Sequence, residues 1–329
     1  MNELIDVKGL KVYFNIKRGF IEDIFSKEQV VIKAVDGVSF SLKEGEILSL
    51  AGESGSGKTT AGKAVLNLVK PTSGKVLFDN EDISIKNAKE LKVFRQNAQM
   101  IFQDPYQSLN PKQAVIDIIS EPLLIHNLVH GEKEKKYKVI AALEQAGLTP
   151  AEEYLYRYPH ELSGGERQRA AIAGSIILNP KFIVADEPVS MLDVSIRIGI
   201  LNLLMELRDK KNISFIFITH DLSLAWLISD RIAIMYLGKI VESGGPELIE
   251  GKCLHPYTKA LIDVMPVPKA MKNRSKNVLK GETPNPIKIP SGCRFHPRCS
   301  LAEDICKMEE PPLIDICKGH QVACHLFLR

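Results

Sequence analysis

The chain has 329 residues, a quarter of them charged, and a formal net charge of +3. This length is sufficient for one substantial α/β domain and a smaller second unit. No run of five or more like charges occurs, so we expect no nucleic-acid arm. No stretch reaches the roughly eighteen consecutive apolar residues of a membrane-spanning helix, and the acidic start MNELIDVKGLKVYF does not fit a secretory signal. We therefore expect an intracellular protein.

The first 50 residues predict β-strands. Val38, Phe40 and Leu42 alternate with polar neighbours, and the apolar run EILSLA then enters a glycine-rich loop. Residues 110–175 are helix-like, and KYKVIAALEQAGL places Gly147 where a helix ends. An α/β architecture follows from this order.

Two apolar strands are predicted at 182–186 (FIVAD) and 214–220 (SFIFITH), separated by a helix built on IRIGILNLLMELRDK. Strand, helix and strand in this order predict a parallel, buried sheet. DRIAIMYLGKIVESG predicts a hairpin that turns at Gly238, and the Pro-, Lys- and Asn-rich stretch from Pro266 predicts a linker.

The segment GESGSGKT, Gly52 to Thr59, fits G-x-x-x-x-G-K-[ST] and lies between a predicted strand and a predicted helix. Backbone N–H groups of such a loop cradle phosphates, Lys58 reaches the β- and γ-phosphates, and Thr59 ligates Mg²⁺. FIVADEP adds Asp186 at a strand end, suited to Mg²⁺, and Glu187, suited to activate water.

A second anion-binding segment, LSGGERQRAAIAGSIILNP, places Ser163, Gly164 and Gly165 before a long predicted helix. One nucleotide seldom needs two phosphate cradles. We therefore expect this segment to serve a nucleotide bound to another subunit, so that ATP lies between two chains.

These motifs, in this order over residues 1 to about 250, resemble the ATP-binding subunits of ABC transporters. The resemblance implies a P-loop NTPase cassette at 1–255, with a RecA-like core, an antiparallel β subdomain and a helical subdomain at about 110–175. It also implies that SMLDVS (190–195) is the D-loop. Glu166 and Met191 stand where the family usually has Gln and Ala, which leaves interface detail open.

The resemblance implies ATP and Mg²⁺ as ligands. Glu187, His220 and Lys58 would be catalytic, and Thr59, Gln103 and Asp186 would hold Mg²⁺. Tyr13 or Phe14 would stack on adenine, although both also suit packing on a strand face. The full set of implied nucleotide contacts is Tyr13, Phe14, Gly52, Ser54, Gly55, Ser56, Gly57, Lys58, Thr59, Thr60, Gln103, Ser163, Gly164, Gly165 and Asp186.

VIKAVDGVSF, IFQDPYQSLNP, RYPHELSGGERQR and LHPYTKALI resemble the oligopeptide and dipeptide importer branch, and within it the second ATPase subunit. This implies a peripheral ATPase on the cytoplasmic face of the membrane, paired with a second ATPase subunit or with a copy of itself. Two permease subunits and an external solute-binding protein would be its partners, and nucleic acid would not. A soluble ABC clamp acting on nucleic acid or ribosomes, and an importer of another cargo such as nickel, are the alternatives.

The remaining residues, 256–329, are predicted to form a small extension with four clustered cysteines: Cys293, Cys299, Cys306 and Cys324. Four thiolates suit a [4Fe–4S] cluster, which some relatives of this kind carry in their C-terminal extension, or Zn²⁺, with His296, His320 and His325 as competing ligands. Reduced thiols or disulfides are the other alternative. Nothing in the sequence places these cysteines near Lys58 or Glu187, so we expect a structural or redox-sensing role.

Overall fold

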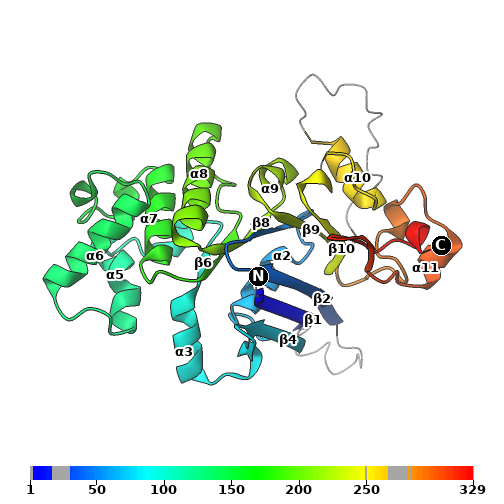
Figure 1. Ribbon diagram of the computed structural model, residues 1–329, viewed down its shortest axis with the longest axis horizontal. Helices are drawn as coiled ribbons and strands as arrows, with labels where there is room; N and C mark the ends of the chain where they lie inside the picture. Colours follow the sequence, from blue (N-terminus) through cyan, green and yellow to red (C-terminus); the bar gives the residue numbers. More distant parts are fainter. Residues whose placement is uncertain (1–2, 17–29, 249, 266–280, 282–283, 329) are drawn as a thin grey trace, which may run out of the picture. The chain divides into compact units, whose positions relative to one another are not determined.

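The computed structural model of the protein describes residues 3–16, 30–248, 250–265, 281 and 284–328. They divide into two compact units (Figure 1). The helical unit comprises Leu42–Glu46 and Ile85–Phe217, and the strand-rich unit comprises Glu3–Ser41, Ile47–Ser84 and Ile218–Arg329. Among the residues described, no helix has both the length and the apolar character needed to span a membrane.

Helices dominate the helical unit, and three of them, α5, α6 and α7, pack against one another (green in Figure 1). The predicted helical segment is confirmed, and Gly147 adopts a left-handed φ of 75° just after Ala146, the C-cap of α6. The elements of this unit are α3 (Ala88–Asn97), β6 (Ala98–Ile101), α4 (Pro105–Ser108), α5 (Val115–Ile125), α6 (Glu132–Gln145), η2 (Ala151–Glu153), η3 (Pro159–Glu161), α7 (Gly164–Ile176), β7 (Phe182–Asp186) and α8 (Val194–Lys211).

The strands of the helical unit are short and buried. β6 pairs with β7 in parallel, with Gln99 opposite Ile183. Every residue of β7 is buried, as is every residue of β8 (Ser214–Thr219), which follows α8 and begins in this unit. The predicted order of strand, helix and strand, with both strands buried, is thereby confirmed.

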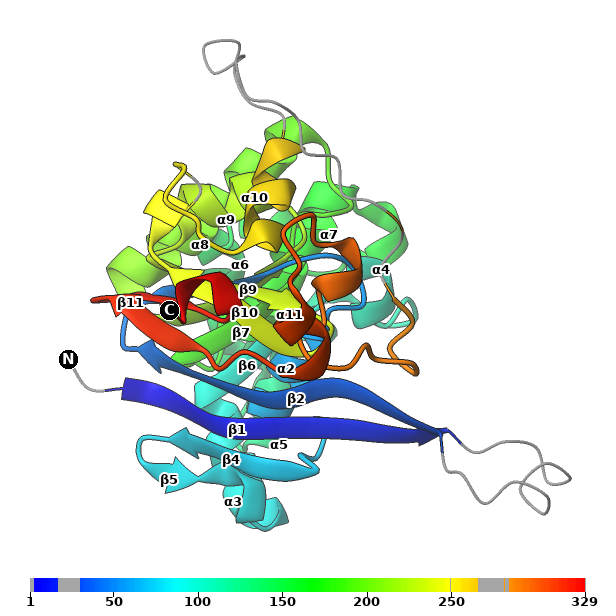
Figure 2. The same ribbon diagram turned by 90° about the vertical axis from the view of Figure 1, so that its right-hand side faces the viewer.

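The strand-rich unit contains a four-stranded sheet, ordered β2-β1-β4-β5 (Figure 2). β1 pairs antiparallel with β4, and Gly74 of β4 has a φ of 89° where β1 lies too close for a Cβ atom. The strands are β1 (Glu3–Ile16), β2 (Val30–Lys43), β4 (Ser73–Phe78) and β5 (Glu81–Asp82), followed by η1 (Ile83–Ile85).

A second group of strands in this unit is ordered β11-β12-β10-β9-β3. β3 (Ile47–Ala51) runs parallel to β9 (Arg231–Tyr236), and β9 forms an antiparallel hairpin with β10 (Lys239–Gly244). The hairpin turns at Leu237 and Gly238, both with positive φ, as a two-residue turn requires. The predicted hairpin is confirmed.

The described C-terminal residues, 284–328, are called the tail here, and they join this sheet. β12 (His320–Val322) pairs antiparallel with β10, and β11 (Ile314–Cys317) pairs with β12. The predicted linker lies largely outside the described residues. The other elements of the unit are α2 (Lys58–Val65), α9 (Leu222–Ile228), η4 (Pro246–Leu248), α10 (Pro256–Asp263), η6 (His296–Arg298), α11 (Asp304–Met308) and η7 (His325–Phe327).

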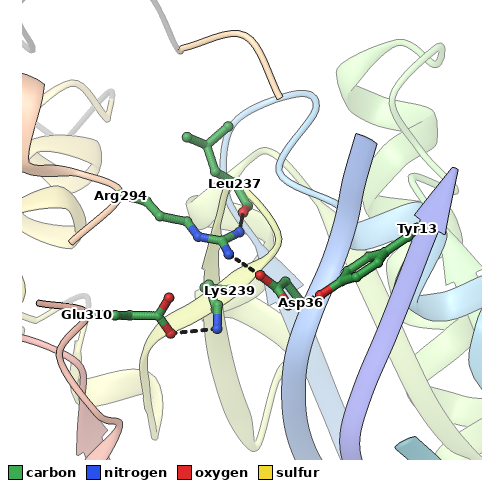
Figure 3. Close-up of polar contacts among 6 residues, drawn as sticks. All are labelled: Tyr13, Asp36, Leu237, Lys239, Arg294 and Glu310. Atoms are coloured by element: carbon green, nitrogen blue, oxygen red, sulfur yellow. Dashed lines mark hydrogen bonds and ion pairs between the residues drawn. The ribbon is translucent and has the colours of Figure 1, made fainter. Parts of the chain in front are cut away.

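A polar network fastens the tail to the strands (Figure 3). The buried guanidinium of Arg294 donates to the carboxylate of Asp36 on β2 and to the carbonyl of Leu237. The hydroxyl of Tyr13 donates to the other oxygen of Asp36, and burial together with this hydrogen bond raises the pKa of Tyr13 to about 12. Because both oxygens of the Asp36 carboxylate accept a hydrogen bond, the energetic cost of burying its charge is compensated.

Candidate nucleotide site

The loop between β3 and α2 has the backbone of a phosphate cradle. Gly52, Gly55 and Gly57 have φ values of 146°, 77° and 100°. A Cβ atom on Gly57 would lie 2.1 Å from the carbonyl oxygen of Ala34, and one on Gly52 would lie 2.2 Å from that of Met235. Two of the glycines are therefore required by close packing as well as by φ.

Lys58 is buried at the start of α2, and its ammonium group lies within the loop. Nζ donates to the carbonyl oxygens of Gly52 at 2.8 Å and Glu53 at 2.9 Å, and to Oγ of Ser56 at 3.4 Å. No side chain caps α2, and the N-terminus of a helix is a favourable position for an anion. The loop thus holds Lys58 in place, and Lys58 and the loop would bind phosphate together.

The remaining loop residues differ in exposure. Ser56 is buried, Ser54 and Gly55 are exposed, and Thr59 and Thr60 are half-buried in the first turn of α2. His220 belongs to the same unit, follows β8 directly and is exposed. Asp221 caps α9 by accepting from the N–H of Ser223 at 2.8 Å, which fixes the chain just after the histidine.

In the helical unit, Asp186 ends β7 and is buried, and Glu187 follows it with a left-handed φ of 45°. Non-glycine residues seldom adopt such a φ, and residues with this kind of backbone strain occur most often at functional sites. Nε2 of Gln103 donates to Oε2 of Glu187 at 3.1 Å. Ser190, at the start of the SMLDVS segment, donates to the carbonyl oxygen of Glu187 at 3.1 Å. The structure therefore brings Gln103 and Glu187 together.

Ser163 is the N-cap of α7 and forms a capping box with Glu166. Oε2 of Glu166 accepts from the N–H of Ser163 at 2.8 Å, and hydrogen bonds from Ser163 lower the pKa of Glu166. A Cβ atom on Gly165 would lie 2.9 Å from Cγ2 of Ile196, so α7 begins tightly against α8. The departure from Gln at position 166 has a local explanation, because a carboxylate near a helix N-terminus is favourable.

Tyr13 and Phe14 alternate on β1. The hydroxyl of Tyr13 is bound to Asp36, and Nζ of Lys33 lies 5.7 Å from its ring centroid. Phe14 is 42% exposed. Of the two aromatic rings, Phe14 is the more accessible to a ligand.

The site residues named from the sequence fall into two groups, each within one unit. The loop of Gly52 to Thr60 and His220 lie in the strand-rich unit. Gln103, Ser163 to Gly165, Asp186 and Glu187 lie in the helical unit. Within the second group, Gln103 and Glu187 are in direct contact.

The cysteines of the tail do not form a metal site among the described residues. No group of three or more Cys, His, Asp or Glu side chains there could hold a metal ion. The expected histidine ligands have other partners: His296 bonds to Cys293 O, His320 to Glu242, and His325 to Glu309 O. The expectation that these histidines would compete for a metal is not supported.

The cysteine thiols nevertheless influence one another. No disulfide joins the cysteines of the described chain. Burial first, and then the proximity of Cys306, Cys324 and Cys299, raise the pKa of Cys293 to about 11. Burial likewise raises the pKa of Cys299 and Cys324, so these three thiols favour the neutral form.

Sequence reasoning missed three residues that bear on the loop. Arg298, in the tail, forms an ion pair with Glu53, the second residue of GESGSGKT. Oη of Tyr257 on α10 accepts from the N–H of Glu53 at 2.9 Å. The tail therefore contacts the loop that holds Lys58, which nothing in the sequence indicated. No local pattern could have revealed a contact across 245 residues.

Two family models match the chain: "ABC transporter" over residues 35–190, and "Oligopeptide/dipeptide transporter, C-terminal region" over residues 241–306. The oligopeptide transport ATP-binding protein AppF of Bacillus subtilis (strain 168) is 46% identical, over 98% of this chain and 97% of the relative. The dipeptide transport ATP-binding protein DppF of Haemophilus influenzae is 42% identical, over 98% of this chain and 96% of the relative. A dimeric structure of the ATP-binding cassette MJ0796 in a post-hydrolysis state, bound to ADP and Pi, is similar with a TM-score of 0.64 and 29% identity, over 74% of this chain and 98% of that one.

Proposed function

Because the chain belongs to the family of oligopeptide and dipeptide ABC transporter ATP-binding proteins, we propose that it hydrolyses ATP to drive uptake of di- or oligopeptides through partner permeases. The observation that carries this proposal is the Gly52–Thr59 loop with Lys58 buried inside it. A loop of this kind binds the phosphates of a nucleotide. We retain 1–255 as the cassette and 256–329 as the extension.

The proposed chemistry is in-line attack of water on the γ-phosphoryl group. Glu187 orients and polarises the water, while Lys58 and His220 stabilise the charge that develops on phosphate oxygens. Gln103, which donates to Glu187, fixes the direction of that carboxylate. Mg²⁺, when bound, neutralises charge on the β- and γ-phosphates, and Thr59, Gln103 and Asp186 are the residues to hold it.

The proposed assembly pairs this chain with a second ATPase subunit or with a copy of itself. Ser163 caps α7, and Gly164 and Gly165 form its first turn; the N-terminus of a helix suits a phosphate, here one supplied by the partner's nucleotide. The dimeric MJ0796 cassette, with ADP and Pi bound, supports this arrangement. Two permease subunits would anchor the pair at the cytoplasmic face of the membrane, and an external solute-binding protein would deliver peptide.

The test of this function is uptake. In cells that carry the chain with its permeases, Lys58→Ala should abolish ATP-dependent uptake of a labelled oligopeptide, and the chain should co-purify with membrane permeases. A matched control is Lys63→Ala, at the last turn of the same helix, which should leave uptake intact. Recovery with ribosomes or nucleic acid, and unaltered uptake, would favour the soluble clamp.

For the tail we retain the [4Fe–4S] cluster as a hypothesis, with Zn²⁺ as the alternative. It is supported by the mutual proximity of Cys293, Cys299, Cys306 and Cys324, and it requires these thiols to move closer than they lie here. Anaerobically purified protein should absorb near about 400 nm and contain about four irons per chain. Cys299→Ser should bleach it, with Cys317→Ser as control. A colourless anaerobic preparation with one zinc per chain would contradict the cluster.

A further inference from the structure

The tail makes a two-pronged ion pair with the phosphate loop. Nη1 of Arg298 lies 2.7 Å from Oε2 of Glu53, and Nη2 lies 3.0 Å from Oε1. The side chains are 6% and 24% exposed. A bidentate pair shielded from water is stronger and more directional than a surface ion pair.

Glu53 is held at its backbone as well. Its N–H donates to the hydroxyl of Tyr257 at 2.9 Å, and its carbonyl oxygen accepts from Nζ of Lys58 at 2.9 Å. Side chain, N–H and C=O therefore each have a fixed partner. The contacts that orient Glu53 therefore also orient its carbonyl group, which accepts the hydrogen bond from Lys58.

Arg298 is itself firmly placed. Its guanidinium lies 5.9 Å from the ring centroid of Tyr236, and its N–H donates to the carbonyl oxygen of Phe295 at 3.0 Å. The ring of Phe295 packs against Tyr236 and Tyr257 with centroids 5.4 and 5.3 Å apart. These aromatic contacts pack the tail against β9 and α10, so the backbone that carries Arg298 is held in a fixed position next to the loop.

The charge of this pair matters as much as its geometry. Glu53 is the acidic residue of a loop that is expected to bind a triphosphate. Without Arg298, this partly buried carboxylate would lose the cation that neutralises it, and its negative charge would repel the incoming polyanion and attract the ammonium of Lys58. Both effects would weaken phosphate binding.

We propose that Arg298 is a positioning residue for nucleotide binding, which neutralises Glu53 and fixes the peptide that holds Lys58. This inference rests on the proposed function, because it assumes that the loop binds ATP. It assigns the tail a part in the nucleotide site of its own chain.

The test is equilibrium binding of Mg²⁺-ATP to the full chain, combined with kcat and KM in the assembled transporter. Arg298→Gln should raise the Kd for ATP by about tenfold, because it removes the cation that neutralises Glu53 and breaks the bidentate contact. KM should rise with Kd while kcat at saturating ATP stays nearly constant. The double variant Glu53→Gln with Arg298→Gln should regain most of the affinity.

The matched control is Lys307→Gln, which breaks an exposed ion pair with Asp304 in the same tail and should leave Kd unchanged. A folded Arg298→Gln with wild-type Kd would overturn the inference, and so would a double variant no better than the single one. If Arg298→Gln does not fold, Arg298→Lys keeps the charge but loses the two-pronged contact, and its Kd should rise by a smaller factor. An unchanged Kd there would also overturn it. Absence of ATP binding by the wild-type chain would instead refute the proposed function, and this inference with it.

Discussion

His320 on β12 donates a hydrogen bond from Nε2 to Oε1 of Glu242 on β10 at 2.9 Å, where the glutamate is 0% exposed. The same carboxylate accepts from the N–H groups of Leu254 and His255 at 2.6 and 3.2 Å. One buried acid thus ties the tail and the segment before α10 to the central hairpin.

We predict that His320→Leu destabilises the fold by about 1–3 kcal/mol, because it leaves a buried carboxylate without one of its donors. Urea unfolding of the full chain measures this change. The control Glu206→Gln, in an exposed ion pair on α8, should change the free energy of unfolding by less than about 0.5 kcal/mol. A loss for His320→Leu as small as that of the control would show that the hydrogen bond contributes little.

A second prediction concerns pH. Burial, with a smaller effect of Lys259, lowers the pKa of His255 to about 3, and Nδ1 of this histidine accepts from the N–H of Tyr257 at 3.0 Å. Between about pH 6.5 and 3 the unfolded chain therefore binds a proton that the folded chain does not. The contribution of His255 to stability is complete above pH 6.5 and is lost as the pH falls, by about 2 kcal/mol at pH 5.

His255→Asn should reduce this dependence, since Asn also caps a helix without titrating. The measurement is the free energy of unfolding at several pH values for the variant and the wild type. His130→Asn, at an exposed position, is the control. Parallel curves for wild type and His255→Asn would contradict the assignment.

The third prediction concerns catalysis. Glu187→Gln keeps the shape of the side chain beside Gln103 but removes the charge that polarises water. ATP binding should survive, hydrolysis should slow by about 10² to 10⁴, and an ATP-bound closed dimer should accumulate. Turnover and size-exclusion chromatography with ATP measure both effects. Wild-type turnover in the variant would remove Glu187 from the mechanism.

The fourth prediction concerns the partner subunit. Ser163→Arg should abolish cooperative ATPase activity in the two-ATPase complex and spare nucleotide binding to the isolated chain. Because Ser163 also caps α7, Ser163→Ala serves as a control that loses the cap, at about 1 kcal/mol, without adding bulk or charge. Loss of nucleotide binding by the isolated Ser163→Arg chain would contradict a site shared between subunits.

Much of the fold could be predicted because its signals are local. FIVAD coincides with β7, SFIFITH exceeds β8 by one residue, and Gly238 lies in the predicted turn. Continuous apolar runs identify buried strands, and positive φ values select glycine, so neither depends on distant contacts.

The position of the tail could not be predicted, for the opposite reason. Arg298 and Glu53 are far apart in sequence, and an arginine in a Pro-rich loop has no periodic pattern that names its partner. The cysteine spacing likewise did not predict how the thiols are arranged. Cys293 and Cys306 are joined by a backbone hydrogen bond of 2.8 Å, from the N–H of Cys293 to the carbonyl oxygen of Cys306. The choice between Tyr13 and Phe14 depended on Asp36, which only tertiary structure brings to Tyr13.

The pairing of β12 with β10 also protects the protein from self-association. Glu242 and Ser243 lie opposite Val322 and Gln321, and the N–H of Ala323 donates to the carbonyl oxygen of Val241 at 2.8 Å. A chain cut before the tail would present this side of β10 as an open edge, with backbone groups ready to pair with another molecule. The tail therefore covers the edge strand β10. A chain without the tail should aggregate, and this aggregation would be detected before a loss of ATP binding or hydrolysis could be measured.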